Sequence, residues 1–344
     1  MKKYFVFLIL AGSFFLFWFI YSEIFTAEAQ YIPELIFKVA KGENVAELAK
    51  RLEQEQVIRN GWFFRKYVSW KKIDRKINHG SFVVKSPITL ARVAEVLSLP
   101  GLNERTITII PGWNIEDIAS YFEKEGLASK DKVFNLIGRP GIDLTLPGET
   151  TPRLSLNYKI LQTRPIHVSF EGYLKPDTYR IFTDARLEEI FTKLIVARQA
   201  EFSETLYTDI QKQGRTVHQI LTMASILERE VKLKDDRAKV ADIFWRRFTN
   251  NWALQADSTV HYAVGKKGEV FTTKEERASL NPWNTYRYSG LPPGPISTPG
   301  ITSIMAAIYP EKNEYWYFLT TDQGEVKYAK SLEEQQKNIA KYLR

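Results

Sequence analysis

The sequence contains no cysteine, which excludes disulfide bonds and thiolate metal sites. Its few histidines lack the spacing of metal ligands, so no metal site is expected; they are His79, His167, His218 and His261. The chain also has no His-Glu-x-x-His, no Gly-x-Ser-x-Gly, no Walker loop and no dinucleotide fingerprint. The sequence therefore predicts no cofactor and no nucleic-acid partner.

The chain contains both acidic and basic residues, with a modest excess of basic ones. The 48 Lys and Arg against 40 Asp and Glu give a formal net charge of +8. That excess could suit an anionic partner, such as phospholipid headgroups or wall polymers. The alternative is a solvated basic surface, which we favour because Lys and Arg are spread along the whole chain.

Only one stretch is apolar enough to cross a membrane. Residues 4–22 hold 19 residues without a charge, which as a helix would be roughly 28 Å long, about the thickness of a bilayer core. Two lysines precede this run while Glu23 and Glu28 follow it, so the positive-inside bias places the N-terminus in the cytoplasm. Trp18 and Tyr21 lie near the outer end, where aromatic rings prefer the interface. These features predict a single-pass anchor with the rest of the chain outside the cytoplasm.

A cleavable signal peptide is the competing interpretation. Ala27-Glu28-Ala29 resembles a small-x-small cleavage site, after which Gln30 would begin a mature chain. However, the apolar run is longer than the usual signal core of about 7–15 residues, which favours a retained anchor. Both interpretations export the remainder of the chain.

An internal repeat follows, at an offset of 70 residues. Residues 42–49 align with residues 112–119, and each copy reads as a short strand, a glycine turn and an amphipathic helix. Asn44 and Asn114 stand where an N-cap belongs. The two expected strands cover residues 37–40 and 106–110. Chance similarity is the alternative, because strand–glycine–helix patterns are common.

These features predict an α+β chain with several parts. The expected parts are a cytoplasmic tip and anchor (1–23), a linker (24–36), an α+β module (37–104), a second module (105–182) with an insertion rich in Pro and Gly (138–165), and a C-terminal α+β domain (183–344). In the last part, helical patterning covers residues 187–210, 217–231, 235–248, 302–308 and the segment from 332, with a strand at 315–319.

The segment 217–231 contains the strongest candidate for chemistry, Glu228. The apolar residues of this helix form one stripe, made of Val217, Ile220, Leu221, Ala224, Leu227 and Val231. Glu228 falls inside the stripe, and a carboxylate on an apolar face is costly to ionise, which is the property a general acid needs. The alternative places Glu228 at the edge of the stripe, paired with Lys232 at i+4.

A row of polar residues follows at 254–262. If this segment is extended, Gln255, Asp257 and Thr259 share one face and could line a saccharide groove. The alternative is that Asp257 caps a helix that starts at Thr259.

The loop 281–300 contains five prolines, so it should be rigid despite its length. Trp283 or Tyr288 could stack on a sugar face, and three neighbours offer polar contacts: Asn284, Thr285 and Tyr286. A structural crossover is the alternative, although a loop of this length in a compact domain is usually functional.

Five strings together resemble the family of membrane-anchored endolytic murein transglycosylases with a LysM-like module. They are Glu-Gly-Tyr-Leu-Lys-Pro-Asp-Thr-Tyr (171–179), Ala-Ser-Ile-Leu-Glu-Arg-Glu (224–230), Leu-Gln-Ala-Asp (254–257), Asn-Thr-Tyr (284–286) and Gly-Leu-Pro-Pro-Gly-Pro-Ile (290–296). They occur in the family's order and spacing, and the resemblance covers essentially the whole chain. Two features depart from the pattern: Ser258 stands where the family usually has proline, and the insertion 138–165 is longer than usual.

The resemblance implies that Glu228 is the catalytic acid of a lytic transglycosylase. It implies cleavage between N-acetylmuramic acid and N-acetylglucosamine with formation of a 1,6-anhydro ring, which favours the acid role of Glu228 over the ion pair. It implies a LysM-like fold from Thr106 to near Tyr179. It also implies glycan contacts by a set of polar residues, namely Glu171, Asp177, Gln255, Asp257, Thr259, Asn284, Thr285 and Tyr286.

The partners that the resemblance implies are peptidoglycan glycan strands, the lipid bilayer of the bacterial cell membrane, and penicillin-binding synthases. Two rival functions stay open. One is a hydrolytic muramidase, in which Asp257 or Glu230 supplies the second carboxylate. The other is a non-enzymatic scaffold that uses the two α+β modules to hold the cell wall.

Overall fold

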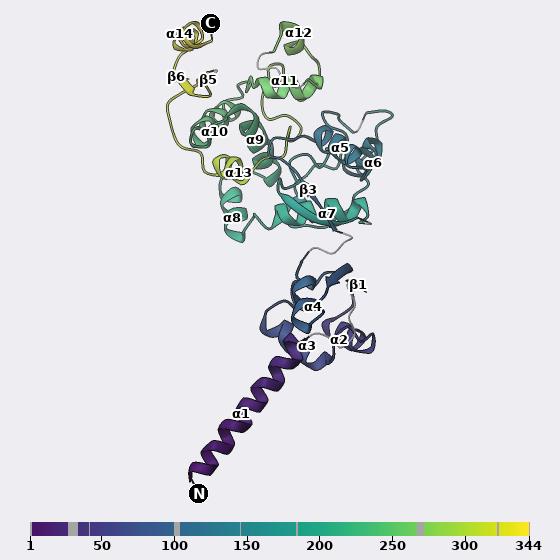
Figure 1. Cartoon of the computed structure of the whole chain (residues 1–344). Helices are drawn as coiled ribbons and strands as arrows, with labels where there is room; N and C mark the ends of the chain where they lie inside the picture. The colour runs from purple at the N-terminus through teal and green to yellow at the C-terminus, as the bar shows by residue number, and fades with distance from the viewer. Residues whose placement is uncertain are drawn as a thin grey trace. The chain divides into compact units, whose positions relative to one another are not determined.

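The computed structural model describes residues 2–26, 34–40, 42–99, 104–144, 146–183, 185–266, 272–321 and 323–343. The chain forms two compact units: unit 1 comprises Met1–Ile107 and Tyr179–Ala185, and unit 2 comprises Thr108–Thr178 and Arg186–Arg344. Helices predominate, with three two-stranded sheets in the described part of the chain (Figure 1). The predicted α+β class is therefore confirmed. The candidate cleavage site at 27–29 lies outside the described residues.

The N-terminal helix α1 covers Lys2–Phe25, so the apolar run is helical as expected. Within the described residues, no helix combines the length and the apolar character needed to cross a membrane. The C-terminal end of α1 is packed, because Ile24 contacts the core of unit 1. The expected linker 24–36 is consequently shorter than predicted, since α1 continues to Phe25 and strand β1 begins at Glu34.

Unit 1 is built on a two-stranded sheet covered by short helices. Strands β1 (Glu34–Val39) and β2 (Gly80–Lys85) pair antiparallel, from Glu34 opposite Lys85 to Val39 opposite Gly80. Helices α2 (Val45–Gln54), α3 (Gly61–Trp70) and α4 (Leu90–Leu97) share a core with this sheet. The core contains the inward side chains of all five elements, including Phe37, Leu48, Leu52, Phe64, Val68, Phe82, Val84, Val93 and Leu97.

The predicted internal repeat is confirmed in three dimensions. Strand β3 (Glu104–Thr108) and helix α5 (Ile115–Lys124) begin 70 residues after β1 and α2. Gly42 and Gly112 have φ values of 83° and 85°, and Asn44 and Asn114 each close a capping box. A second helix, α6 (Lys130–Ile137), and a strand paired with β3, β4 (Thr178–Phe182), follow. Both copies therefore have the order strand, helix, helix, strand.

The rest of unit 2 is mainly helical. Its elements are η1 (Lys159–Leu161), α7 (Leu187–Gln199), α8 (Glu204–Lys212), α9 (Val217–Glu230), α10 (Lys234–Thr249), α11 (Asp257–Val264), α12 (Lys274–Arg277), α13 (Ile301–Ile308), the antiparallel hairpin β5 (Tyr317–Thr320) and β6 (Val326–Ala329), and α14 (Leu332–Tyr342). The expected helices near 217, 235, 302 and 332 and the strand near 315 are present. The helix predicted for 187–210 is two helices, separated at residues 200–203.

The second module does not form a separate body at the predicted boundaries of 105 and 182. Residues 108–178 belong to the same compact unit as the helices after residue 186. The insertion takes part in this packing, since Gly141 donates to the Tyr262 hydroxyl and accepts from the Asn281 side chain, both at 2.9 Å. Sequence periodicity describes each element separately, so it could not reveal that this module shares a core with later helices.

Candidate active site

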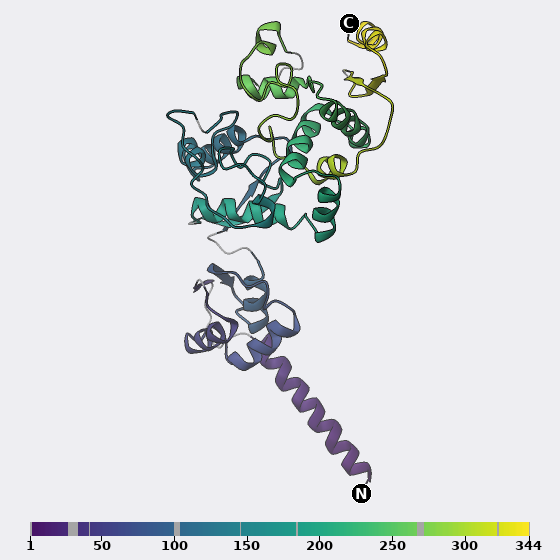
Figure 2. The ribbon, with the colours of Figure 1, turned by 180° about the vertical axis from the view of Figure 1, so that it is seen from behind.

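Helix α9 carries Glu228 and lies among four other helices of unit 2. It packs against α8, α10, α11 and α13, and its position beside α10 and α13 is visible from both sides (Figures 1 and 2). Thr216 and Gln219 form a capping box that fixes its first turn. From Val217 to Leu227, every residue except Gln219 is buried. The helix is therefore buried nearly all round, and the expectation of a single apolar stripe was too narrow.

The carboxylate of Glu228 is held by four hydrogen bonds. Arg237 of α10 donates from Nη2 to Oε1 at 3.0 Å and from Nη1 to Oε2 at 3.2 Å. The Gly300 N–H and the Ser303 hydroxyl donate to Oε2 at 2.9 and 2.7 Å. Gly300 is the N-cap of α13, so the positive end of that helix faces the carboxylate. Together these donors satisfy the hydrogen-bonding needs of a carboxylate whose side chain is only 9% exposed.

Two sequence-based expectations about the surroundings of Glu228 were wrong. The carboxylate lies among hydrogen-bond donors and not in an apolar setting, and its cationic partner is Arg237 instead of the Lys232 of the alternative interpretation. Both errors have one cause. The donors come from α10 and from the start of α13, and the periodicity of α9 contains no information about either.

The two oxygens of Glu228 differ in how many further hydrogen bonds each can accept. A carboxylate offers about four lone-pair positions, two on each oxygen. Oε2 accepts three hydrogen bonds, whereas Oε1 accepts one, from Arg237. A Cβ atom on Gly112 would lie 3.9 Å from Cγ of Glu228, and one on Gly300 would lie 3.5 Å from Oε2. Oε1 consequently has more unused capacity to accept a hydrogen bond than Oε2, and backbone flanks the carboxylate at both glycines.

The turn before α5 is fastened to the loop that precedes α13. Gly112 donates to the carbonyl of Thr298 at 2.8 Å, and the Thr298 N–H donates to the carbonyl of Trp113 at 2.6 Å. The Arg229 side chain donates to the Gly112 carbonyl at 3.2 Å. A turn of the second repeat thus becomes part of the surroundings of Glu228, within unit 2.

Glu171 is fully buried, so the predicted glycan contact at this residue is not supported by its position. Its Oε2 accepts from the N–H of Ile115 at 2.9 Å and from the Tyr262 hydroxyl at 3.2 Å, which joins the start of α5 to α11. Oε1 is buried without a hydrogen-bond partner among the described residues. Burial raises the pKa of Glu171 to about 8, so the side chain is mainly a neutral acid at pH 7.

Glu171→Gln is expected to flatten the pH dependence of stability. The folded protein holds the proton of Glu171 up to a pKa of about 8, against 4.5 for an ordinary glutamate. The stabilisation that this group contributes is therefore fully present below pH 4.5 and is lost as the pH rises through 8. In the unmodified protein, its titration should lower the free energy of unfolding by about 2–3 kcal/mol between pH 5 and 7. Urea titrations at several pH values measure this slope. The exposed Glu325→Gln is the control, and an unchanged slope in Glu171→Gln would contradict the assignment.

The extended row expected at 255–259 is not formed, because α11 begins at Asp257. Thr259 is fully buried, and its hydroxyl lies 2.6 Å from the Ala256 carbonyl and 2.8 Å from the Thr285 hydroxyl. Thr285 is also buried, and its hydroxyl accepts from the Ala256 N–H at 3.1 Å. These two threonines join the start of α11 to the proline-rich loop, and Gln255 remains exposed with φ of 57°.

Asp257 does not cap a helix that starts at Thr259. The N–H of Ser258 donates instead to Oε1 of Glu230, at 2.8 Å, so the cap comes from the end of α9. Asp257 accepts from the Tyr286 hydroxyl at 2.9 Å and from the Thr272 hydroxyl. Burial raises the pKa of Glu230. The two carboxylates considered for a hydrolytic mechanism are therefore both engaged at the start of α11.

The proline-rich loop is held mainly by its own polar residues. Asn284 is fully buried, and its Nδ2 donates to the carbonyls of Arg277 and Ser279 at 2.9 and 2.8 Å. Trp283 is 2% exposed, so it cannot stack on a sugar, whereas Tyr288 is 42% exposed. The buried residues Trp283 and Asn284 therefore serve the structure of the loop, whereas the exposed ring of Tyr288 is accessible to a ligand.

Asp177 lies at the start of β4 and is exposed. Its Oδ1 accepts from the N–H of Thr178 at 2.8 Å, and Lys175 Nζ lies 3.0 Å from Oδ2. The hydrogen bond from Lys175 is the main cause that lowers the pKa of Asp177. The side chain is accessible, so a glycan contact there stays a prediction.

Gly172→Ala is expected to be strongly destabilising. Gly172 has φ of 80°, and a Cβ atom there would lie 2.6 Å from two atoms of the Pro295 ring. Strain and overpacking together should remove about 2–4 kcal/mol of unfolding free energy. Gly126→Ala is a matched control, because Gly126 has φ of 67° and open space around it. Denaturant melts compare the two, and equal losses would contradict the packing argument.

The chain was then compared with known proteins. The sequence profile of the YceG-like family matches residues 37–341. The chain belongs to the YceG-like family. It is 31% identical over 307 residues to a Bacillus subtilis protein named endolytic murein transglycosylase, covering 89% of this chain and 84% of that one. A Streptococcus pneumoniae protein of the same name is 26% identical, over 98% of this chain and 64% of its own length.

A crystal structure of a YceG-like protein from Listeria monocytogenes has a similar fold. It is 28% identical in sequence, with a TM-score of 0.56, and the match covers 89% of this chain and 98% of that one. The resemblance inferred from the five strings is therefore confirmed at the level of the family.

In this YceG-like protein, sequence reasoning missed three groups that contact Glu228: Arg237, Gly300 and Ser303. One signal for Arg237 was present. It shares an apolar face of α10 with Val240, Ala241 and Phe244, all buried, so it is a basic side chain at an inward position. A buried charge is costly unless it is paired or hydrogen-bonded, so such a residue indicates acceptor groups inside the fold.

Proposed function

We propose that this protein is an endolytic murein transglycosylase. It cleaves the β-1,4 bond between N-acetylmuramic acid and N-acetylglucosamine in glycan strands and leaves a 1,6-anhydro end. The observation that carries the proposal is the geometry of Glu228. Its carboxylate is nearly buried and fixed by four hydrogen bonds, and it keeps lone-pair capacity on Oε1. The names of the relatives from B. subtilis and S. pneumoniae support the same reaction.

One carboxyl group can perform both proton transfers of this reaction. Protonated Glu228 donates from Oε1 to the glycosidic oxygen as the bond from that oxygen to muramyl C1 breaks. The carboxylate then takes the proton of the muramyl C6 hydroxyl as the C6 oxygen bonds to C1 and closes the 1,6-anhydro ring. The nucleophile belongs to the substrate, so its effective concentration is high, and neither water nor a covalent enzyme intermediate takes part. Protonation of Oε1 disturbs only one hydrogen bond, while Arg237, Gly300 and Ser303 stabilise the carboxylate left after the first transfer.

The rival functions differ from this proposal in their products. A hydrolytic muramidase would need a second carboxylate, but Glu230 and Asp257 are engaged at the start of α11. The test is digestion of purified sacculi by the full chain, followed by mass spectrometry of the muropeptides. Anhydro ends support the lytic reaction, reducing ends support hydrolysis, and unchanged strand length supports a scaffold.

We also propose that residues 106–179 form a LysM-like module that holds the glycan strand. Support comes from the order strand, helix, helix, strand in this region and from its turn at Gly112, which lies beside Glu228. Binding of sacculi by the full chain, measured with Glu228→Gln to prevent cleavage, tests this role.

The N-terminal helix is proposed as the anchor in the bacterial cell membrane, with the catalytic part outside and penicillin-binding synthases as partners. Support comes from the 19 uncharged residues at 4–22, the charges that flank them, and the exposure of aromatic residues such as Phe14, Phe17 and Trp18. Membranes washed with alkaline carbonate retain a spanning protein. Release of the full chain by that treatment would contradict the anchor.

A further inference from the structure

One face of helix α3 in unit 1 carries large aromatic side chains in the open. Trp62 is 58% exposed and Trp70 is 72% exposed, while Phe63 and Tyr67 are partly buried against the core. We name Trp62, Phe63, Lys66, Tyr67 and Trp70 the α3 surface. Two tryptophans with so much exposed surface on a ten-residue helix indicate a surface that contacts a membrane or another molecule.

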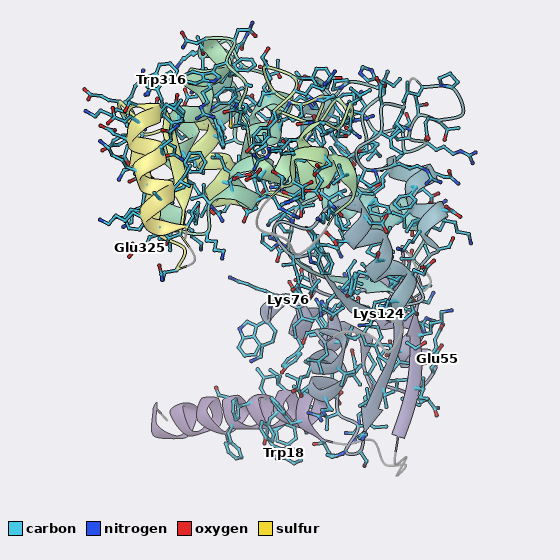
Figure 3. All side chains as sticks on the ribbon, turned by 90° about the horizontal axis from the view of Figure 1, so that it is seen from above. Trp18, Glu55, Lys76, Lys124, Trp316 and Glu325 are labelled. Carbon is cyan, nitrogen blue, oxygen red and sulfur yellow. The ribbon has the colours of Figure 1, made fainter. Side chains whose placement is uncertain are left out.

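The α3 surface is continuous with the outer half of α1. The Phe63 ring meets the Phe19 ring edge to face at 6.0 Å, and the Tyr67 ring meets the Phe25 ring at 6.5 Å. Helices α1 and α3 lie side by side there, as both views show (Figures 1 and 2). Trp18, which projects from α1 in Figure 3, is 57% exposed. The open aromatic side chains of the two helices therefore form one connected region.

The charge of the segment that contains α3 is mainly positive. The segment 59–76 contains seven basic side chains and one acidic side chain, Asp74, so it holds most of the net charge of +8. Lys and Arg occur along the whole chain, as expected, but they are denser in this segment. Lys66 lies over the Trp62 ring at 5.6 Å and Lys71 over the Trp70 ring at 4.6 Å. Aromatic rings with lysines beside them are typical of the interface between hydrocarbon and anionic headgroups.

We propose that the α3 surface is a membrane-binding surface, which lies in the interface of a bilayer that contains anionic lipids. The proposal rests on the proposed anchoring of α1. If residues 4–22 occupy the hydrocarbon core, Phe19 lies about 5 Å inside its outer edge, at 1.5 Å per helical residue. Phe63 touches Phe19, so it must lie at a similar depth. The adjacent Trp62 then enters the acyl boundary, and the lysines reach the headgroups.

This placement changes the role of the anchor. Ile24 packs on the core of unit 1, and α1 contacts both α3 and α4. Unit 1 is consequently held directly on the bilayer surface through α3 and is not suspended on a loose tether.

The absence of cysteine makes a direct test possible, because single cysteines can be labelled without background. Trp62→Cys and Trp70→Cys, each in the full chain, would carry an environment-sensitive nitrobenzoxadiazole label in nanodiscs that contain phosphatidylglycerol. Ile36→Cys is the matched control, an apolar residue 63% exposed on β1, at the end of unit 1 away from α1 (Figure 1). We expect several-fold brighter emission at 62 and 70 than at 36, with quenching by doxyl-labelled lipids only at 62 and 70.

The outcomes separate the two proposals. If the chain stays in carbonate-washed membranes but the labels at 62 and 70 behave like the label at 36, the α3 proposal is wrong and the anchor stands. If carbonate releases the chain while the labels at 62 and 70 are quenched by lipid, the anchor is wrong and the α3 surface stands. Replacement of phosphatidylglycerol by phosphatidylcholine should reduce the quenching at 70. Unchanged quenching would refute the part of the proposal that concerns anionic lipid.

Discussion

Replacing Glu228 with glutamine is expected to lower the rate of formation of 1,6-anhydro ends by about 1,000-fold or more. Glutamine has the same shape and keeps an oxygen that can accept from Gly300 and Ser303. It cannot donate an acidic proton to the glycosidic oxygen or accept the proton of the C6 hydroxyl. Muropeptide mass spectrometry on glycan strands treated with each protein measures the change.

Folding must be measured alongside this variant, because glutamine leaves the buried guanidinium of Arg237 without a counter-charge. Arg237 keeps hydrogen bonds to the Val231 carbonyl at 3.0 Å and to the Thr302 hydroxyl at 3.0 Å, which limits the loss. A melting curve and a sacculus-binding assay of the variant separate loss of chemistry from loss of fold. A folded variant that binds sacculi and does not cut them is the expected result.

Glu230→Gln is the matched control, two residues further along the same helix. Its carboxylate accepts from the N–H of Ser258, and glutamine retains an acceptor there, so activity should stay within about tenfold of the unmodified protein. If Glu228→Gln retains full activity, Glu228 is not the acid. If Glu230→Gln is inactive and the unmodified protein yields reducing ends, the hydrolytic mechanism is correct.

Replacing Arg237 with methionine is expected to lower the free energy of unfolding by about 3–5 kcal/mol. The side chains of Arg237 and Glu228 are 8% and 9% exposed, so removal of one leaves a nearly buried charge unpaired. Arg237 also joins three elements, since its donors reach Val231 after α9 and Thr302 and Ser303 in α13. Urea denaturation measures the loss.

An exposed pair gives the control for this prediction. Arg92 and Glu95 are 50% and 59% exposed and lie 2.8 Å apart on α4, so Arg92→Met should change stability by less than about 1 kcal/mol. The double variant Arg237→Met with Glu228→Gln should be more stable than the sum of the two single losses predicts, because no unpaired charge remains. Additive losses would show that the pair acts through packing alone.

The repeat and most helix boundaries could be predicted from sequence, because they depend on short-range signals. Asn44 and Asn114 cap their helices through their own backbone neighbours, and Gly42 and Gly112 supply the positive φ that the turn needs. The start of α11 was predicted at the wrong residue, because no short-range signal marks it. Its first turn is capped by Glu230, a residue 28 positions earlier, so local chemistry did not mark it.

The candidate acid could also be found from sequence, but the physical reason first given for it was wrong. Glu228 is conspicuous because it lies within the apolar stripe of its helix and within a family string. Its surroundings are polar, since Arg237, Gly300 and Ser303 converge from other elements. In the same way, Thr259, Asn284 and Thr285 appear as ligand-binding residues in the sequence and are buried hydrogen-bonding residues in the fold.

The sequence by itself therefore determined the exclusion of thiol chemistry, the repeat, the family and the choice of Glu228 as the candidate acid. These depend on composition, on contacts within a few residues, and on strings that stay in order along the chain. Only the tertiary structure decided which oxygen of Glu228 keeps more capacity to accept hydrogen bonds, that the second repeat packs with the C-terminal helices in one unit, and that α3 lies beside α1. Each of these depends on groups that come together from distant parts of the chain. Spacing and periodicity carry no information about such long-range contacts.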